Sequence, residues 1–310
     1  MTTSTVPAAP ISSVKPVELP LPGRPAPLLV RVTAPLRGGR LPVVVLSHGN
    51  GWSMDGYAPL AEHWAGEGFV VVQPTHLDSR SRGLGHDDPG FSDIWRWRIA
   101  DLTAVLDHLD LVEAALPGLA GRVARDRVAV AGHSWGAQSA GALLGAGVLS
   151  PDGGSEERFA DPRVRAGVLL AATGTGDSLT PFAAEHLPFM RPAYAHLSTP
   201  TLVVAGDADR SALSTRGPDW FTDAYHLSPG ADTLLTLVGA EHSLGGVVGH
   251  EVAETTDADP ARVALVQRVT AAWLRTRLGV DAEAWPATAA DVRRAGGAVG
   301  ALTTADAPAS

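Results

Sequence analysis

A continuous apolar run at residues 41–46 is the feature that most constrains the fold, and several similar runs follow it along the chain. Uninterrupted apolar runs of this kind are typical of strands that helices cover on both faces. Longer segments of helical length separate the runs. This alternation predicts an α/β fold, a doubly wound and mostly parallel sheet flanked by helices. The expected strands cover residues 28–33, 41–46, 68–73, 127–131, 166–171, 201–205 and 233–238, and the expected helices cover residues 57–66, 93–115, 135–148 and 260–278.

Length and composition fit one large domain with two flanking segments. The chain has 310 residues, of which 45% are hydrophobic and 18% are charged, enough for a single sizeable core. Residues 1–26 are rich in Pro, Ser and Thr, so we expect a flexible arm there, with room for a short edge strand. We expect the α/β domain over residues 27–280, and a terminal helix with a frayed tail over residues 281–310.

Charge and cysteine content exclude several classes of protein. A formal net charge of −9 disfavours nucleic acid and anionic membranes as partners. The absence of cysteine excludes disulfides, a thiol nucleophile and thiolate metal sites. No apolar stretch approaches the ~20 residues of a membrane span, so we expect no stable membrane insertion. The first ten residues lack the pattern of a secretory signal, which favours a cytoplasmic protein; a secreted protein whose signal had been removed would look the same.

One strand runs directly into a Gly-x-Ser-x-Gly motif. The residues are Gly132-His133-Ser134-Trp135-Gly136, and a helix-like segment follows. A strand, a sharp turn and a helix form the context in which such a serine becomes an exposed nucleophile, and the flanking glycines relieve the crowding of the turn. Ser134 is therefore the predicted nucleophile. His133 lies inside the turn, and we do not expect it to act as the base.

The base and its acid are expected on loops after two later strands. Serine needs an adjacent base, and in this arrangement the acid and then the histidine follow the nucleophile along the chain. His242 follows the strand at 233–238 and is the predicted base, with His250 as a weaker alternative. Asp209 is the predicted acid. Asp207 competes for that role, although it more naturally caps its own loop by accepting backbone N–H bonds.

A glycine-rich loop, Ser47-His48-Gly49-Asn50-Gly51-Trp52, follows the strand at 41–46. Glycines let backbone N–H groups approach a substrate oxygen, so we assign the N–H groups of Asn50 and Trp135 as oxyanion donors, with His48 bracing the loop.

Residues 173–198 combine prolines with apolar side chains and could form a lid over an apolar substrate; an ordinary surface connection is the alternative. The ring of Trp135 either faces the cleft or packs under neighbouring loops. The expected pocket residues are Gly49, Gly51, Trp52, His133 and Phe182.

Two further groups of charged residues invite an interpretation. Arg98 and Asp101 are three positions apart on a predicted helix, which favours a surface ion pair. Asp207 and Asp209, together with Asp87 and Asp88, have no spacing typical of metal ligands, so we expect no metal site.

Three segments together resemble a known superfamily. They are Ser47-His48-Gly49-Asn50-Gly51, the stretch from Leu60 to Val71 that ends in Ala-Gly-Glu-Gly-Phe-Val-Val, and Gly239-Ala240-Glu241-His242-Ser243-Leu244-Gly245-Gly246. With the serine motif, they make residues 28–280 similar to the α/β-hydrolases. The resemblance is to the branch of serine esterases that includes chlorophyllases, platelet-activating-factor acetylhydrolases and cutinase-like polyester hydrolases.

The resemblance implies a reaction and its residues. It implies hydrolysis of carboxylic esters through an acyl-enzyme, with Ser134, Asp209 and His242 as the triad and Asn50 and Trp135 as oxyanion donors. It implies no cofactor and a small-molecule or lipid-like ester as the substrate. An acyltransferase with the same triad, or a non-catalytic binding module with the same fold, are the alternatives. The sequence leaves the oligomeric state open.

Overall fold

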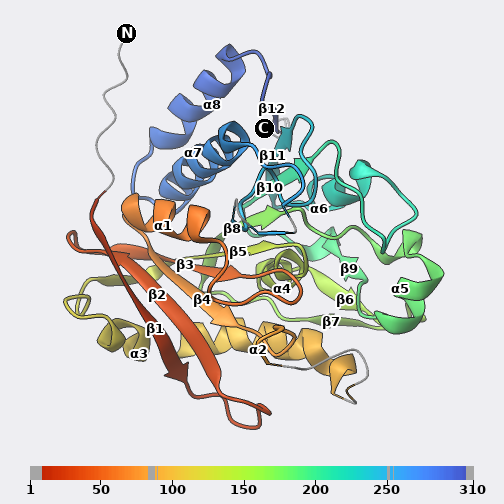
Figure 1. Ribbon diagram of the computed structural model, residues 1–310, viewed down its shortest axis with the longest axis horizontal. Coiled ribbons are helices and arrows are strands. Elements are labelled where there is room, and N and C mark those ends of the chain that lie inside the picture. Colours follow the sequence, from red (N-terminus) through yellow and green to blue (C-terminus); the bar gives the residue numbers. More distant parts are fainter. Residues whose placement is uncertain (1–8, 83–87, 89, 250–251, 254, 305–310) are drawn as a thin grey trace.

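The computed structural model describes residues 9–82, 88, 90–249, 252–253 and 255–304, and its centre is a nine-stranded sheet (Figure 1). The strand order is β1-β2-β4-β3-β5-β8-β10-β11-β12. These strands are β1 (Ile11–Leu19), β2 (Leu28–Pro35), β3 (Leu41–Ser47), β4 (Val70–Thr75), β5 (Val123–His133), β8 (Val164–Leu170), β10 (Thr201–Gly206), β11 (Ala231–Leu237) and β12 (Gly300–Thr304).

The middle of the sheet is parallel, and its strands are the apolar runs of the sequence. From β4 through β3, β5, β8 and β10 to β11, every neighbouring pair is parallel. Every residue of β3 and of β10 is buried, because helices cover both faces of the sheet there. The prediction of a doubly wound, mostly parallel α/β sheet is therefore confirmed.

Helices lie on both sides of this sheet. α1, α7 and α8 lie on one side of it, and α2 and α3 lie on the other, where α2 also packs against α4 (Figure 1). The longer helices are α1 (Ala58–Gly66), α2 (Ile94–Asp107), α3 (Leu109–Ala115), α4 (Trp135–Leu144), α7 (Pro260–Arg277) and α8 (Ala284–Arg294). Shorter helical pieces are α5 (Pro181–His186), α6 (Asp223–Leu227), η1 (Phe91–Asp93), η2 (Gly176–Ser178), η3 (Tyr194–His196) and η4 (Pro218–Thr222).

The edges of the sheet differ from the sequence expectations. The short edge strand allowed for in residues 1–26 is β1, nine residues long and antiparallel to β2. At the other edge, residues 300–304 were expected to belong to a frayed tail, but they form β12, which pairs antiparallel with β11. Both edge strands form through backbone hydrogen bonds to a neighbouring strand. Neither segment is a continuous apolar run, so the apolar pattern does not reveal them.

The helix predicted for residues 135–148 ends earlier. α4 stops at Leu144 because Gly145 takes a left-handed conformation, with φ of 116°. Residues beyond it join a small antiparallel sheet in the order β7-β6-β9. Its strands are β6 (Gly147–Leu149), β7 (Glu156–Arg158) and β9 (Pro192–Ala193).

The segment of residues 173–198 contains two short 3₁₀ turns, α5 and β9. Phe189, Met190 and Tyr194 are buried in the core, whereas 57% of Phe182 is exposed. Much of the segment is thus packed onto the domain. Its movement as a lid stays a prediction.

Candidate active site

Ser134 lies at a tight turn between β5 and α4. Its φ of 57° and ψ of −122° are unusual for a residue with a side chain. The turn brings backbones so close that a Cβ on Gly132 would lie 2.0 Å from the carbonyl oxygen of Gly136. A Cβ on Gly136 would lie 2.1 Å from the carbonyl oxygen of Ser47. Both glycines of the motif are therefore required by packing.

Ser134, His242 and Asp209 lie in hydrogen-bond contact with one another. The Nε2 atom of His242 is 2.9 Å from Oγ of Ser134. Its Nδ1 atom is 2.9 Å from Oδ2 and 3.2 Å from Oδ1 of Asp209. A carboxylate accepts only, so Nδ1 carries the proton and Nε2 is free to accept from the serine hydroxyl. The side chain of Asp209 is fully buried, whereas that of His242 is 42% exposed and can meet a substrate.

Two other acidic residues hold the backbone around this relay. Oδ1 of Asp207 accepts a hydrogen bond of 2.6 Å from the N–H of Gly239. Asp207 was expected to cap its own loop, but this bond ties it to the neighbouring loop, which follows β11. Asp257 was missed by sequence reasoning. Its Oδ2 atom accepts from the N–H groups of Glu241 and Gly245, at 2.8 and 2.9 Å, and so clamps the loop on both sides of His242. The alternative base, His250, lies outside the described residues.

The glycine-rich loop after β3 has most of its N–H groups occupied. The N–H of Gly49 donates to Oη of Tyr57 at 3.0 Å, and that of Gly51 donates to Oδ2 of Asp78 at 3.3 Å. Between them, the N–H of Asn50 has no partner among the described residues. The N–H of Trp135 is also without one there, since the first residue of a helix has no acceptor within it.

A buried ion pair supports this loop from behind. Nη1 of Arg98 is 2.7 Å from both carboxylate oxygens of Asp78, and each side chain is only 1% exposed. Arg98 also donates to the carbonyl of His48. Burial alone would raise the pKa of Asp78. The charge and hydrogen bonds of Arg98, together with smaller contributions from His48 and His76, outweigh burial and lower that pKa to about 2. The expected surface ion pair between Arg98 and Asp101 is wrong: both residues are buried, because α2 turns this face towards the sheet.

Asp101 instead belongs to a second serine–histidine–aspartate arrangement. Nδ1 of His76 is 2.8 Å from Oδ2 of Asp101, and Nε2 is 2.9 Å from Oγ of Ser47. Arg24, which precedes β2, donates to both oxygens of Asp101 at 2.7 and 3.1 Å. Ser47, His76 and Asp101 are each 0% exposed, so no substrate can reach them. Burial lowers the pKa of His76 and raises that of Asp101 to about 6.

His48 lies between this arrangement and the loop. Its Nε2 atom accepts from the backbone N–H of His76 at 3.0 Å, so Nδ1 carries the proton and donates to the carbonyl of Gly49 at 2.6 Å. Both bonds use the neutral ring, and burial lowers the pKa of His48 well below its ordinary value. His48 therefore contacts the loop in the way expected for a brace.

A cavity of about 190 Å³ opens beside Ser134. Of the expected pocket residues, Gly49, Trp52 and His133 line it. Gly51 and Phe182 do not; Phe182 lies on α5, its ring 4.6 Å from that of His186. The ring of Trp135 packs under neighbouring segments, edge-on to Phe189 at 5.6 Å, which was one of the two alternatives. The full lining is Gly49, Asn50, Trp52, Arg80, His133, Ser134, His242, Ser243 and Val248.

Phe221 was not expected near the site. It is 1% exposed on η4, and its ring centre is 5.5 Å from that of His242. Nothing in the local sequence distinguishes it from other core aromatics.

Among the described residues, no group of three or more His, Asp or Glu side chains is arranged to hold a metal ion. Within the same part of the chain, no helix is long and apolar enough to cross a membrane.

Part of the chain is similar to a known protein family. The family model described as Chlorophyllase matches residues 8–149, a little under half of the chain. No curated protein matches the chain. The matched segment includes the loop at Asn50 and the turn at Ser134, but it ends before Asp209 and His242. The chain has the α/β-hydrolase fold and is similar to the Chlorophyllase family over residues 8–149, so the resemblance inferred from its motifs is confirmed for that part of the chain.

Proposed function

We propose that this protein is a serine hydrolase that cleaves carboxylic esters through an acyl-Ser134 intermediate. The observation that carries the proposal is the relay from Asp209 through His242 to Ser134, with both links at 2.9 Å. Three loops that are far apart in the sequence bring a carboxylate, an imidazole and a hydroxyl into the order that acyl transfer requires. The match to an esterase family supports the class of reaction.

The reaction follows from the proton positions. His242 takes the hydroxyl proton through Nε2 as Oγ of Ser134 attacks the ester carbonyl, and a tetrahedral oxyanion forms. The imidazolium then gives its proton to the leaving alcohol oxygen, the C–O bond breaks, and an acyl-serine remains. A water molecule, deprotonated by His242, then attacks the acyl carbon. The bond between that carbon and Oγ breaks, His242 returns the proton to Oγ, and the carboxylic acid is released. Asp209 holds the imidazole in one tautomer and stabilises its charged form.

The N–H groups of Asn50 and Trp135 are the proposed oxyanion donors. Both lack a partner among the described residues, and they belong to segments that meet at Ser134. The neighbouring N–H groups, on Gly49 and Gly51, already donate to side chains of the protein. Losing one such donor typically costs about 3–4 kcal/mol of transition-state stabilisation.

The cavity indicates the size of the acyl group. A volume of about 190 Å³ is smaller than the ~300–1,000 Å³ of pockets that enclose drug-sized ligands. Trp52 and Val248 give the lining apolar surface. We therefore propose esters with short to medium acyl chains as substrates, with most of the alcohol portion outside the cavity.

Hydrolysis of p-nitrophenyl acetate and butyrate tests the function. We expect turnover that falls by ~10³-fold or more in Ser134→Ala. Ser150→Ala is the matched control, because Ser150 lies in the loop between β6 and β7 and hydrogen-bonds only to that loop. Labelling by a fluorophosphonate probe should be lost in Ser134→Ala alone. Equal turnover in the wild type and in Ser134→Ala would eliminate this mechanism, and product analysis with added alcohol separates hydrolysis from acyl transfer.

A further inference from the structure

A buried chain of hydrogen bonds runs beneath the relay, and the mechanism above does not use it. The N–H of Gly49 donates to Oη of Tyr57 at 3.0 Å. Oη of Tyr57 is 2.8 Å from Nδ1 of His133, and Nε2 of His133 is 2.7 Å from the carbonyl oxygen of His242. The chain thus begins in the loop proposed to bind the oxyanion and ends on the backbone of the proposed base.

The direction of every bond in this chain is fixed. A carbonyl oxygen only accepts, so Nε2 of His133 carries a proton and donates to His242. In a neutral ring Nδ1 must then accept, and Tyr57 donates to it. The hydroxyl oxygen of Tyr57 is left to accept from Gly49. Burial, reinforced by the charge that His242 can carry, lowers the pKa of His133 to about 3, which keeps its ring neutral as this arrangement requires.

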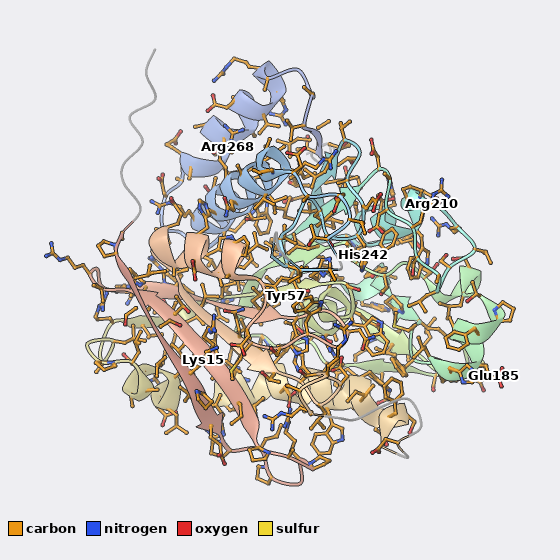
Figure 2. The ribbon with its side chains drawn as sticks, in the orientation of Figure 1. Lys15, Tyr57, Glu185, Arg210, His242 and Arg268 are labelled. Carbon is orange, nitrogen blue, oxygen red and sulfur yellow. The ribbon has the colours of Figure 1, made fainter. Side chains whose placement is uncertain are left out.

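The two side chains are enclosed and held. Tyr57 is 0% exposed and His133 is 4% exposed. The N–H of Tyr57 donates to the carbonyl of Val248 at 2.9 Å, which ties the start of α1 to the loop that carries His242. The ring centres of His133 and His242 are 4.9 Å apart. Tyr57 and His242 lie together near the middle of the view in Figure 2.

We propose that Tyr57 and His133 are positioning residues, which couple the loop at Gly49 to the loop of His242 and fix both relative to Ser134. The inference rests on the proposed function. His133 hydrogen-bonds to the backbone carbonyl of His242, whose ring contacts Ser134, so loss of this bond removes a restraint on the position of the imidazole. A misplacement of about 1 Å in such a group can cost about 10²-fold in rate.

His133→Phe and His133→Gln separate positioning from packing. Phenylalanine keeps the planar ring and removes both hydrogen bonds. A glutamine amide can donate through Nε2 to the carbonyl of His242 and accept from Tyr57 through Oε1. We expect kcat for p-nitrophenyl butyrate to fall by about 10- to 100-fold in His133→Phe, with KM changed by less than about threefold. His133→Gln should recover most of that loss.

Tyr57→Phe tests the other end of the chain, with nearly the same volume and without the hydroxyl. Because both residues act through one chain, the double variant Tyr57→Phe/His133→Phe should lose little more than His133→Phe alone. Tyr57→Phe also gives the test if His133→Phe does not fold. Near-UV circular dichroism and the fraction of protein titrated by fluorophosphonate report on folding and on competent sites.

The outcomes are distinguishable from failure of the proposed function. If Ser134→Ala keeps full activity, the esterase mechanism itself fails. If Ser134→Ala is inactive but folded His133→Phe keeps kcat within about twofold, only the positioning role is refuted. Equal losses in His133→Phe and His133→Gln would also refute it, because a purely structural defect would not respond to restored hydrogen bonds.

Discussion

Replacing Arg98 with methionine tests the ion pair behind the loop at Asn50. Methionine keeps a flexible, unbranched apolar side chain but has no charge, so Asp78 would be left as a buried carboxylate with no cation. Both side chains are 1% exposed, and Arg98 contacts both oxygens of Asp78 at 2.7 Å. Breaking a buried pair by removing one partner typically costs about 3–5 kcal/mol. We expect a loss of that size in the free energy of unfolding, measured by urea denaturation at pH 7.

The pH dependence of this loss is a stricter test. In the wild type the pKa of Asp78 is lowered to about 2, so its stabilising contribution is present above the ordinary carboxyl pKa and is lost as the pH falls towards 2. Without Arg98, burial raises that pKa above its ordinary value, and the penalty grows as the pH rises. The deficit of Arg98→Met should therefore be larger at pH 7 than at pH 5.

Two further variants provide a control and a rescue for Arg98→Met. Arg40→Met removes the exposed pair with Asp126, in which the side chains are 66% and 63% exposed, and should not change stability measurably. Adding Asp78→Asn to Arg98→Met should recover part of the loss, because the amide oxygen can still accept from Gly51 without a buried charge. A deficit below about 1 kcal/mol at pH 7 for Arg98→Met would refute the reasoning.

Three other variants test separate parts of the structure. Asp209→Asn should lower kcat for p-nitrophenyl butyrate by about 10⁴-fold, because the asparagine favours the wrong tautomer of His242. The kcat of Asp207→Asn should stay close to that of the wild type, and similar losses in both variants would contradict the assignment of the acid. Gly136→Ala should lose at least about 2 kcal/mol of stability, because its Cβ would lie 2.1 Å from a backbone oxygen, while Gly39→Ala has nothing within 4 Å and should be neutral in the same denaturation series. The pKa of His133 is lowered to about 3 in the folded protein, so the unfolded state binds the proton first and wild-type stability falls as the pH drops below about 6.5. Relative to His133→Gln, the wild type should lose about 2 kcal/mol of unfolding free energy between pH 7 and pH 5. Parallel curves of unfolding free energy against pH for the two proteins would contradict this.

The residues of the relay could be predicted because each follows a strong strand signal. β5, β10 and β11 are parallel, so their carboxyl ends lie at one edge of the sheet. Ser134, Asp209 and His242 lie in the segments that follow these ends. Their order along the chain then indicated which residue is the nucleophile, which the acid and which the base. The choice of Asp209 over Asp207 depended on loop geometry. Asp207 accepts from a backbone N–H, but that N–H belongs to Gly239 on the neighbouring loop after β11 and not to the loop of Asp207 itself.

The polar groups behind the relay could not be predicted in the same way. Arginine and aspartate usually lie at the surface, and nothing local marks Arg24, Asp78, Arg98 and Asp101 as buried. Histidine is intermediate, so His76 is no easier to place. The spacing of Arg98 and Asp101 fits a surface pair as well as it fits two residues with separate buried partners. Their burial depends on which face of α2 meets the sheet, and that is decided by contacts across the domain.

The burial of Asp78 and Arg98 has a physical explanation in the loop that they contact. Residues 48–52 form an irregular segment after β3, in which Gly49 is buried, Gly51 is half-buried and Asn50 is exposed. The N–H groups of Gly49 and Gly51 therefore need acceptors that no strand or helix supplies. Tyr57 accepts from Gly49 and Asp78 accepts from Gly51, and Arg98 in turn neutralises Asp78. Apolar side chains in these places would pack well but would leave the two N–H groups unpaired, at about 1–3 kcal/mol each. With both satisfied from within, the N–H of Asn50, which has no partner among the described residues, is the one this loop can offer to a substrate oxygen.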